Sequence, residues 1–369
     1  MTTSYTGAER GVAVSEQPQV MGCNPKESNE LSSLKGRCIE MRVARLAVAF
    51  RRAYWKACLA VLPLLAVAAS PLTPPARALT TAAATPVSAA PPRGYVTDHL
   101  IVISIDGLRP DAIERYGART LLRLMREGSY SLAATTIVPS RTLPSHTSML
   151  TGADLEQHGV TWNREEMEIH GHVATPTIFA AAKQAGFHTA AFFSKSKFQH
   201  LAVPGTLDHV DVPREWPYKR SADRTIDIAE QYLEANRPNL LFVHLGEPDF
   251  VGHLIGWMSV PYSWAVREAD DELADLLETA DRVFGAGNYT VLVTADHGGH
   301  GRDHGSADPR DVTIPWIAWG KGVAPGKVLS PGIRTMDTAA TSLWLLGVEL
   351  PKGSSGKPVE QAFVVQAAN

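Results

Sequence analysis

Carboxylate and imidazole side chains recur in this 369-residue chain at spacings that suit metal binding. Asp249 and His253 stand four residues apart, so on a helix both would project from one face and could hold one ion. Asp296 and His297 are adjacent, which suits a strand-to-loop transition beside a cation, and His304 supplies a further imidazole. Mixed carboxylate and imidazole ligation favours zinc over magnesium, which prefers oxygen ligands. The pattern predicts a centre for divalent metal ions.

A threonine within PSRTLPSHTSMLTG could supply a nucleophile. Thr142 precedes an apolar helical run and would stand at a helix N-terminus, where free N–H groups and the helix dipole favour a phosphate. The simpler interpretation is that Thr142 is only an N-cap, with Pro144 in the first turn, and the two roles are compatible. A threonine hydroxyl attacks well at neutral pH only where a metal or a base removes its proton.

The elements that must position these residues alternate between strands and helices. Short apolar runs predict strands at residues 99–105, 189–193, 240–244, 289–294 and 313–319. Proline, serine and glycine signals predict helices from Pro110 to before Gly128, from Thr175 to Gly186, from Ser221 to before Pro238, and from Pro261 onwards. Strands separated by helices predict an α/β fold with a mostly parallel sheet covered on both faces.

Several of these polar residues follow the predicted strands directly. The first strand runs into Asp106, the third into the segment that holds Asp249 and His253, and the fourth into Asp296 and His297. Ligands of such sheets bind at the carboxyl ends of the strands. Taken singly, a buried Asp at a strand end is often a helix cap and a lone His is more often a core or surface residue. Their joint placement at one edge favours a site.

In order along residues 98–350, these motifs resemble the nucleotide pyrophosphatase/phosphodiesterase branch of the alkaline phosphatase superfamily. The motifs are DGLR at Asp106, TLPSH at Thr142, EQHGVTWN from Glu156 to Asn163, Asp249-x3-His253, Asp296-His297-Gly, and His304-Gly. The resemblance implies a three-layer α/β/α sandwich with a mostly parallel central sheet. It also implies two zinc ions, of which one is held by Asp106, Thr142, Asp296 and His297, and the other by Asp249, His253 and His304. The family's phosphate-binding asparagine corresponds to Asn163.

One departure from the family concerns the last ligand. Larger members have a long insertion before the final histidine, whereas here only Gly298 to Asp303 intervene. His300 is therefore a rival for His304, which we favour because the segment that follows it fits the family pattern. The short insertion also means that the identity of the substrate cannot be carried over.

The mechanism that the resemblance implies is hydrolysis of phosphodiester or pyrophosphate bonds of nucleotide-like substrates by double displacement. One zinc would activate Thr142, the other would stabilise the leaving oxygen, and a covalent phosphothreonine would form and then be hydrolysed. The alternative is a phosphomonoesterase in which Lys195 and Lys197 clamp the extra charge, although the interpretation that we favour for both lysines is that of solvated loop residues. A metal-stabilised binding protein without activity would be expected to lack Thr142.

The N-terminal part of the chain has the pattern of a targeting region. Residues 1–40 are polar and predict a non-native or disordered extension, and residues 41–78 have the basic, apolar and small-residue regions of a signal peptide. Residues 79–94 form an Ala/Thr/Pro linker, and residues 95–369 the catalytic domain. We expect export to the periplasm or the extracellular space, with an uncleaved N-terminal anchor as the alternative and no membrane insertion beyond that segment.

Composition limits the partners. The whole chain has a formal net charge of -3, and cleavage after Ala78 would leave a more acidic, cysteine-free domain. An acidic domain without a basic stripe predicts no nucleic-acid binding. The expected partner is a small phosphate ester, and the sequence gives no indication of the oligomeric state.

Overall fold

A central β-sheet organises the residues that the computed structural model describes, which are 96–214 and 220–364. The predicted extension, signal peptide and linker all lie outside these ranges. The strands are β1 Leu100–Ile105, β2 Ser129–Thr135, β3 Thr189–Phe192, β4 His209–Asp211, β5 Leu240–Leu245, β6 Thr290–Thr294, β7 Thr313–Gly320 and β8 Lys327–Val328. They form one sheet in the order β4-β3-β5-β1-β6-β7-β2-β8.

The sheet is mostly parallel, as predicted. Strand β1 pairs in parallel with both β5 and β6, and β3 pairs in parallel with β5 and β4. Strand β7 runs antiparallel to β6 and β2. Every residue of β1 and β5 is buried, because helices cover both faces of the sheet, and this explains their uninterrupted apolar sequences.

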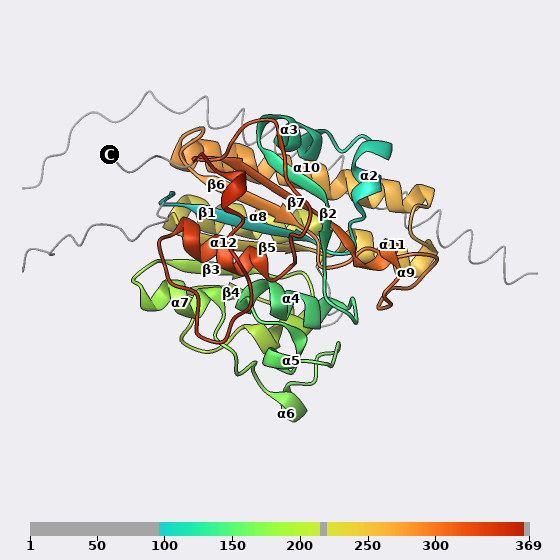
Figure 1. Cartoon of the computed structure of the whole chain (residues 1–369), viewed down its shortest axis with the longest axis horizontal. Coiled ribbons are helices and arrows are strands. Elements are labelled where there is room, and N and C mark those ends of the chain that lie inside the picture. The colour runs from blue at the N-terminus through green and yellow to red at the C-terminus, as the bar shows by residue number, and fades with distance from the viewer. Residues whose placement is uncertain (1–95, 215–219, 365–369) are drawn as a thin grey trace, which may run out of the picture. The chain divides into compact units, whose positions relative to one another are not determined.

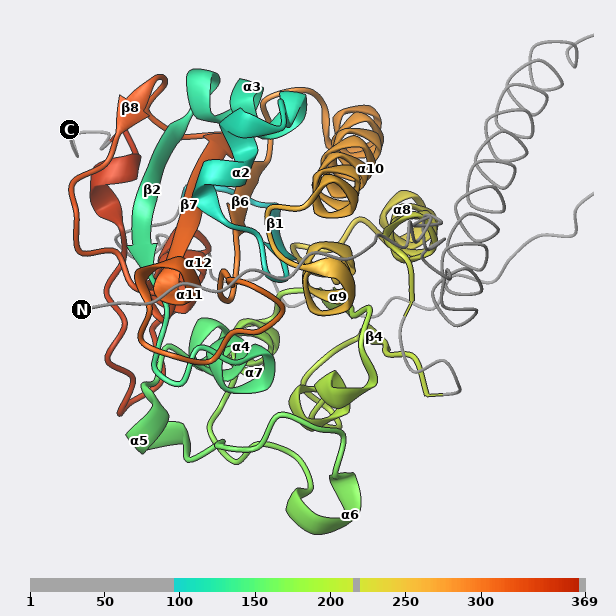
Figure 2. The same ribbon diagram turned by 90° about the vertical axis from the view of Figure 1, so that its right-hand side faces the viewer.

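Helices form the two outer layers (Figures 1 and 2). Helices α3, α8 and α10 pack along one side of the sheet, and α4, α7 and α12 along the other. The helices of the described residues are α2 Pro110–Arg115, α3 Arg119–Glu127, α4 Thr142–Thr151, α5 Leu155–His158, α6 Met167–His170, α7 Ile178–Gln184, α8 Ala222–Asn236, α9 Glu247–Ile255, α10 Val260–Phe284, α11 Pro309–Val312 and α12 Asp337–Leu345, with 3₁₀ helices at Ser196–Leu201 and Glu360–Ala362.

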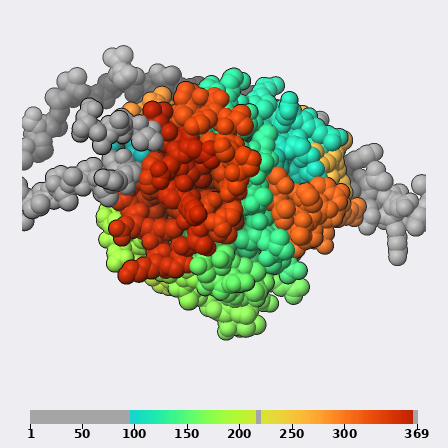
Figure 3. Space-filling model, viewed as in Figure 1, coloured from blue at the N-terminus to red at the C-terminus, as the bar shows by residue number. Residues whose placement is uncertain are grey.

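Two local features differ from the sequence prediction. The helix expected from Pro110 to before Gly128 is two helices, α2 and α3, because Gly117 adopts a left-handed φ of 64° between them. Strands β2, β4 and β8 were not predicted. Strand β2 lies between β7 and β8, and Figure 3 shows it beside the C-terminal part of the described chain, which is coloured red.

The order of the strands brings the chemical motifs together. Strand β1 lies between β5 and β6, and the chain leaves these three parallel neighbours at the same edge of the sheet. Asp106 follows β1, helix α9 with Asp249 follows β5, and Asp296 follows β6. The expectation that strand ends deliver these side chains to one edge is therefore correct. In the described residues no helix is long and apolar enough to cross a membrane.

Candidate metal centre

The first half-site consists of Asp106, Thr142, Asp296 and His297, which converge although they come from distant parts of the chain. His297 Nε2 lies 3.4 Å from Asp106 Oδ1, 3.2 Å from Asp296 Oδ2 and 3.3 Å from Thr142 Oγ1. All four residues are buried. Thr142 is the first residue of α4, and Arg141 rather than Thr142 is its N-cap. The hydroxyl of Thr142 is therefore not committed to capping and faces the half-site.

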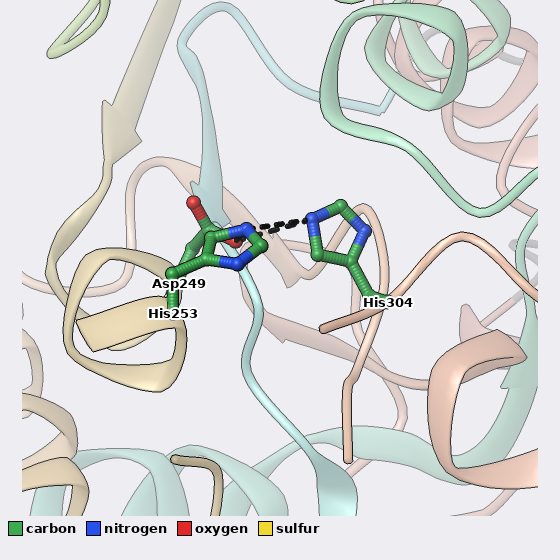
Figure 4. Close-up of side chains that lie close together, drawn as sticks. All are labelled: Asp249, His253 and His304. Carbon is green, nitrogen blue, oxygen red and sulfur yellow. Dashed lines mark hydrogen bonds and ion pairs between the residues drawn. The ribbon is translucent and has the colours of Figure 1, made fainter. Parts of the chain in front are cut away.

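The second half-site consists of Asp249, His253 and His304 (Figure 4). Asp249 and His253 stand one turn apart on α9, as their spacing predicts, with Asp249 Oδ1 3.3 Å from His253 Nε2. His304 reaches them from the loop before α11, and its Nε2 lies 3.5 Å from Asp249 Oδ1 and 3.1 Å from His253 Nε2. The His253 side chain is 42% exposed, so this half-site opens to solvent.

The structure places His304, and not its rival His300, with the other candidate ligands. His300 Nδ1 lies 2.7 Å from Asp311 Oδ1, so the ring is held by the carboxylate of α11. The rings of His304 and His297 stack with centroids 3.6 Å apart, which brings the two half-sites into contact.

Backbone carbonyls orient the three imidazoles. His253 Nδ1 donates to Arg302 O at 2.9 Å, His297 Nδ1 to Gly298 O at 2.8 Å, and His304 Nδ1 to Ser140 O at 2.7 Å. A hydrogen bond from Nδ1 leaves the lone pair on Nε2, and each Nε2 points into the site. The two imidazoles of the second half-site thus direct lone pairs at one another across 3.1 Å, an arrangement that a cation would relieve.

Unpartnered carboxylate oxygens test whether metal ions fit here. Asp106 Oδ1, Asp249 Oδ1 and Asp296 Oδ2 are buried and accept no hydrogen bond. A buried carboxylate oxygen without a partner is costly. These three atoms are also the ones that face the imidazole Nε2 atoms. Asp249, His253 and His304 offer donor atoms that lie within 4.8 Å of one another, and so do Asp106, Asp249 and His297. Asp296 and Thr142 add oxygen atoms beside His297 Nε2, so the residues fit a pair of divalent cations.

Lys195 lies between the two half-sites and is only 3% exposed, so it is not a solvated loop residue. Its Nζ donates to Asp106 Oδ2 at 2.6 Å and to Asp249 Oδ2 at 2.5 Å. Burial alone would raise the pKa of both carboxyls, but Lys195 and the neighbouring histidines together outweigh burial and hold the pKa of both well below their usual range. Burial alone would lower the pKa of Lys195, whereas the two carboxylates raise it. The centre therefore contains ionised carboxylates before any metal binds.

Asn163 and Lys197 lie at the N-terminus of α4, next to Thr142. Asn163 Oδ1 accepts a hydrogen bond from Leu143 N at 2.9 Å and another from Lys197 Nζ at 3.1 Å. Burial, followed by the charge of Lys195, lowers the pKa of Lys197 to about 8. An amide and an ammonium group thus stand where a phosphoryl group attached to Thr142 would need hydrogen-bond donors.

Sequence reasoning missed two buried residues that support the centre. His244 of β5 donates from Nε2 to Asp106 Oδ2 at 2.9 Å, and its Nδ1 accepts from Ser194 Oγ at 2.8 Å. A histidine inside the apolar sequence LLFVHL was the signal that could have identified it. Trp257 packs against the rings of His253 and His304, with centroids 5.1 and 5.8 Å away. No local signal distinguishes Trp257 from an ordinary core residue.

Comparison with known proteins agrees with this geometry. The sequence profile of the type I phosphodiesterase/nucleotide pyrophosphatase family matches residues 100–305. GPI ethanolamine phosphate transferase 1 of Gibberella zeae is 24% identical over 322 residues, which cover 70% of this chain and 32% of that protein. The chain thus spans about a third of the length of that curated relative.

Solved structures show the same fold. An inactive variant of murine ectonucleotide pyrophosphatase/phosphodiesterase 5, in complex with AMP, superposes with a TM-score of 0.62 at 15% identity, covering 72% of this chain and all of that one. The alkaline phosphatase PafA superposes with a TM-score of 0.58 at 14% identity, covering 73% of this chain and 99% of that one. At these identities the likeness establishes an alkaline-phosphatase-like α/β/α fold, as the sequence predicts.

Proposed function

The chain belongs to the type I phosphodiesterase/nucleotide pyrophosphatase family, enzymes that act on phosphate ester bonds, and on that premise we propose that it is an exported, metal-dependent phosphohydrolase. Its proposed substrates are phosphodiesters or pyrophosphates of nucleotide-like compounds, and its proposed nucleophile is Thr142. Its proposed cofactors are two zinc ions, because the centre combines carboxylate and imidazole donors.

One observation carries this proposal. The three buried carboxylate oxygens without partners, the three inward-facing Nε2 atoms and the hydroxyl of Thr142 all meet at one edge of the sheet. A fold can tolerate one orphaned buried oxygen, but three directed at imidazole lone pairs indicate a site built for cations. The proposed nucleophile, Thr142, is part of the first half-site, with its Oγ1 3.3 Å from His297 Nε2.

The residues of this chain divide the proposed reaction between them. When bound, the two ions would supply Lewis-acid activation of the nucleophile and charge stabilisation at the leaving oxygen. The Thr142 oxygen attacks phosphorus, the bond to the leaving oxygen breaks, and a phosphothreonine forms that water then hydrolyses. The Leu143 N–H and the Asn163 carboxamide are placed to hydrogen-bond the phosphoryl oxygens, where charge accumulates. In this structure the Leu143 N–H donates to Asn163 Oδ1. To bind substrate, it would exchange that partner for a phosphoryl oxygen.

A specific observation also favours a second candidate, a phosphomonoesterase that uses Lys195 and Lys197 as its phosphate clamp. Lys197 Nζ lies 3.1 Å from Asn163 Oδ1, so one ammonium group stands beside the phosphate-binding asparagine. A monoester carries more negative charge than a diester and gains more from such a cation. Lys195 is a weaker candidate for a clamp because both Asp106 and Asp249 accept its hydrogen bonds.

The export proposal rests on the N-terminal sequence pattern alone. Sequencing the N-terminus of protein recovered outside the cytoplasm checks the proposed export, and a first residue close to 79 is expected. Recovery of the whole chain, including residues before Met41, in the cytoplasmic fraction would contradict it. The acidic composition of the domain separately supports the expectation that the partner is a small phosphate ester and not a nucleic acid.

The direct experiment compares hydrolysis of bis-p-nitrophenyl phosphate and p-nitrophenyl phosphate by the zinc-reconstituted protein. A larger kcat/KM for the diester is the expected result. A larger kcat/KM for the monoester supports the second candidate, and absence of activity on both, with zinc bound, argues for a binding protein without catalysis.

A further inference from the structure

Lys195 is a buried cation between the two half-sites, and the proposed phosphodiesterase mechanism gives it no role. We propose that Lys195 is a positioning residue that holds Asp106 and Asp249 as one-oxygen ligands of two separate metal ions, instead of clamping phosphate. This inference rests on the proposed two-ion function. It concerns how the chain itself keeps the two half-sites apart.

The division of carboxylate oxygens supports this role. Lys195 Nζ donates to Asp106 Oδ2 at 2.6 Å and to Asp249 Oδ2 at 2.5 Å. The Oδ1 atom of each residue has no hydrogen-bond partner. Asp106 Oδ1 faces His297 Nε2 at 3.4 Å in the first half-site, and Asp249 Oδ1 faces His253 Nε2 at 3.3 Å in the second. Each carboxylate therefore offers one oxygen to its own half-site while the other oxygen is occupied.

The same residues could otherwise hold a single ion between them. Donor atoms of Asp106, Asp249 and His297 lie within 4.8 Å of one another, which is close enough for one shared cation. An ammonium group already bound to both Oδ2 atoms repels a cation from that shared position and limits the rotation of both carboxylates. Without Lys195, the two carboxylates would be free to converge on one ion.

The packing of Lys195 fixes it in this place. A Cβ atom added at Gly246 would lie 3.2 Å from Lys195 Cε, so the lysine stem passes close to the backbone between β5 and α9. Ser194, the preceding residue, is itself held by His244 Nδ1 at 2.8 Å. His244 also donates to Asp106 Oδ2, the same oxygen that accepts from Lys195. The packing of the side chain against Gly246 and the hydrogen bond to Asp106, which His244 also orients, therefore both fix the position of the ammonium group.

Lys197 provides a matched control. It lies two residues further along, within the 3₁₀ helix, and its Nζ contacts Asn163 Oδ1 and no carboxylate of the centre within hydrogen-bond distance. Removing its charge leaves the pairing of Asp106 and Asp249 with Lys195 intact. A general effect of losing a positive charge near the centre would therefore lower zinc binding in variants of both lysines. Loss of the hydrogen bonds from Lys195 to Asp106 and Asp249 would lower it only in the Lys195 variants.

The experiment measures zinc bound per chain by elemental and native mass spectrometry, on the full chain purified in the same buffered concentration of free zinc. It compares wild type, Lys195→Met, Lys195→Gln and Lys197→Met, with far-UV circular dichroism to confirm that each is folded. We expect two ions per chain in wild type and Lys197→Met, and one in both Lys195 variants. Zinc is present throughout because, in the Lys195 variants, a zinc ion shared by Asp106 and Asp249 would replace the missing ammonium charge.

The outcomes distinguish failure of the positioning role of Lys195 from failure of the proposed two-ion function. Two ions bound per chain in either Lys195 variant would overturn the positioning role. Loss of the second ion in Lys197→Met as well as in the Lys195 variants would also overturn it, because the effect would then be general. Absence of bound zinc in wild type would instead refute the proposed function itself.

Discussion

The hydroxyl of Thr142 lies 3.3 Å from Nε2 of His297, across 155 residues of sequence. Helix α4 places the threonine, and the loop after β6 places the histidine. His297 donates from Nδ1 to the carbonyl of Gly298, so a neutral ring presents a lone pair and not a proton to this region. The relationship suits two ligands of one cation.

Removing metal is expected to abolish activity and to lower the unfolding temperature. The apoprotein keeps buried carboxylates that only Lys195 and the imidazoles offset, so a cation that binds the native state alone stabilises it. At free zinc one hundred times its Kd the gain is about 2.7 kcal/mol. Differential scanning calorimetry after chelation and after zinc addition measures the shift. Equal unfolding temperatures in both states would show that no metal binds the native fold.

A methyl group at Gly252 is expected to damage the second half-site. A Cβ atom there would lie 2.6 Å from Cε2 of Trp257, which packs against His253 and His304. Overpacking of this kind costs about 1–3 kcal/mol. We therefore expect Gly252→Ala to lower both stability and zinc affinity, measured by urea unfolding and by chelator competition.

Removal of the ring in Trp257→Ala provides the control for that substitution. The double variant Gly252→Ala/Trp257→Ala lacks the atoms that clash, so it should be less damaged than the sum of the single variants. Strict additivity of the two effects would show that the clash with Trp257 is not the cause.

Much of the centre could be predicted from local sequence, and the reasons are physical. Four-residue spacing puts Asp249 and His253 on one face wherever the segment is helical, and parallel strands bring their carboxyl ends to one edge. The burial of Lys195 could not be predicted in this way. The sequence Lys-Ser-Lys is typical of a solvated loop, and what buries Lys195 is its contact with carboxylates 89 and 54 residues away. Strand β2 likewise depends on its partners β7 and β8.

His158 is expected to contribute to acid sensitivity of the fold. Burial lowers its pKa to about 4 from 6.5, while Nδ1 accepts from Val160 N and Nε2 contacts Ser148 Oγ. The unfolded chain therefore binds this proton at a higher pH than the native state does. The stabilisation is present above pH 6.5 and is lost as the pH falls towards 4.

The variant His158→Asn tests this contribution, since its amide oxygen can replace Nδ1 as an acceptor without titrating. Urea unfolding across that pH range should show a smaller loss of stability for the variant than for wild type. Parallel pH profiles would contradict a role of His158.

Lys197→Met is expected to separate the two candidate activities. If Lys197 assists monoester binding, kcat/KM for p-nitrophenyl phosphate should fall about tenfold, or about 1.4 kcal/mol, with a smaller change for the diester. Because burial lowers its pKa to about 8, the cation is lost as the pH rises through that value, and the wild-type monoester rate should decline there. Equal losses on both substrates would show that Lys197 acts only by orienting Asn163.

The most direct test of catalysis by Thr142 is the hydrolysis rate of zinc-loaded Thr142→Ala on bis-p-nitrophenyl phosphate, with bound zinc measured in the same samples. Since the attacking oxygen is gone while Asp106, Asp296 and His297 remain, we expect zinc to be retained and the rate to fall by at least about a thousandfold. Turnover by the variant at the wild-type rate would contradict a covalent phosphothreonine.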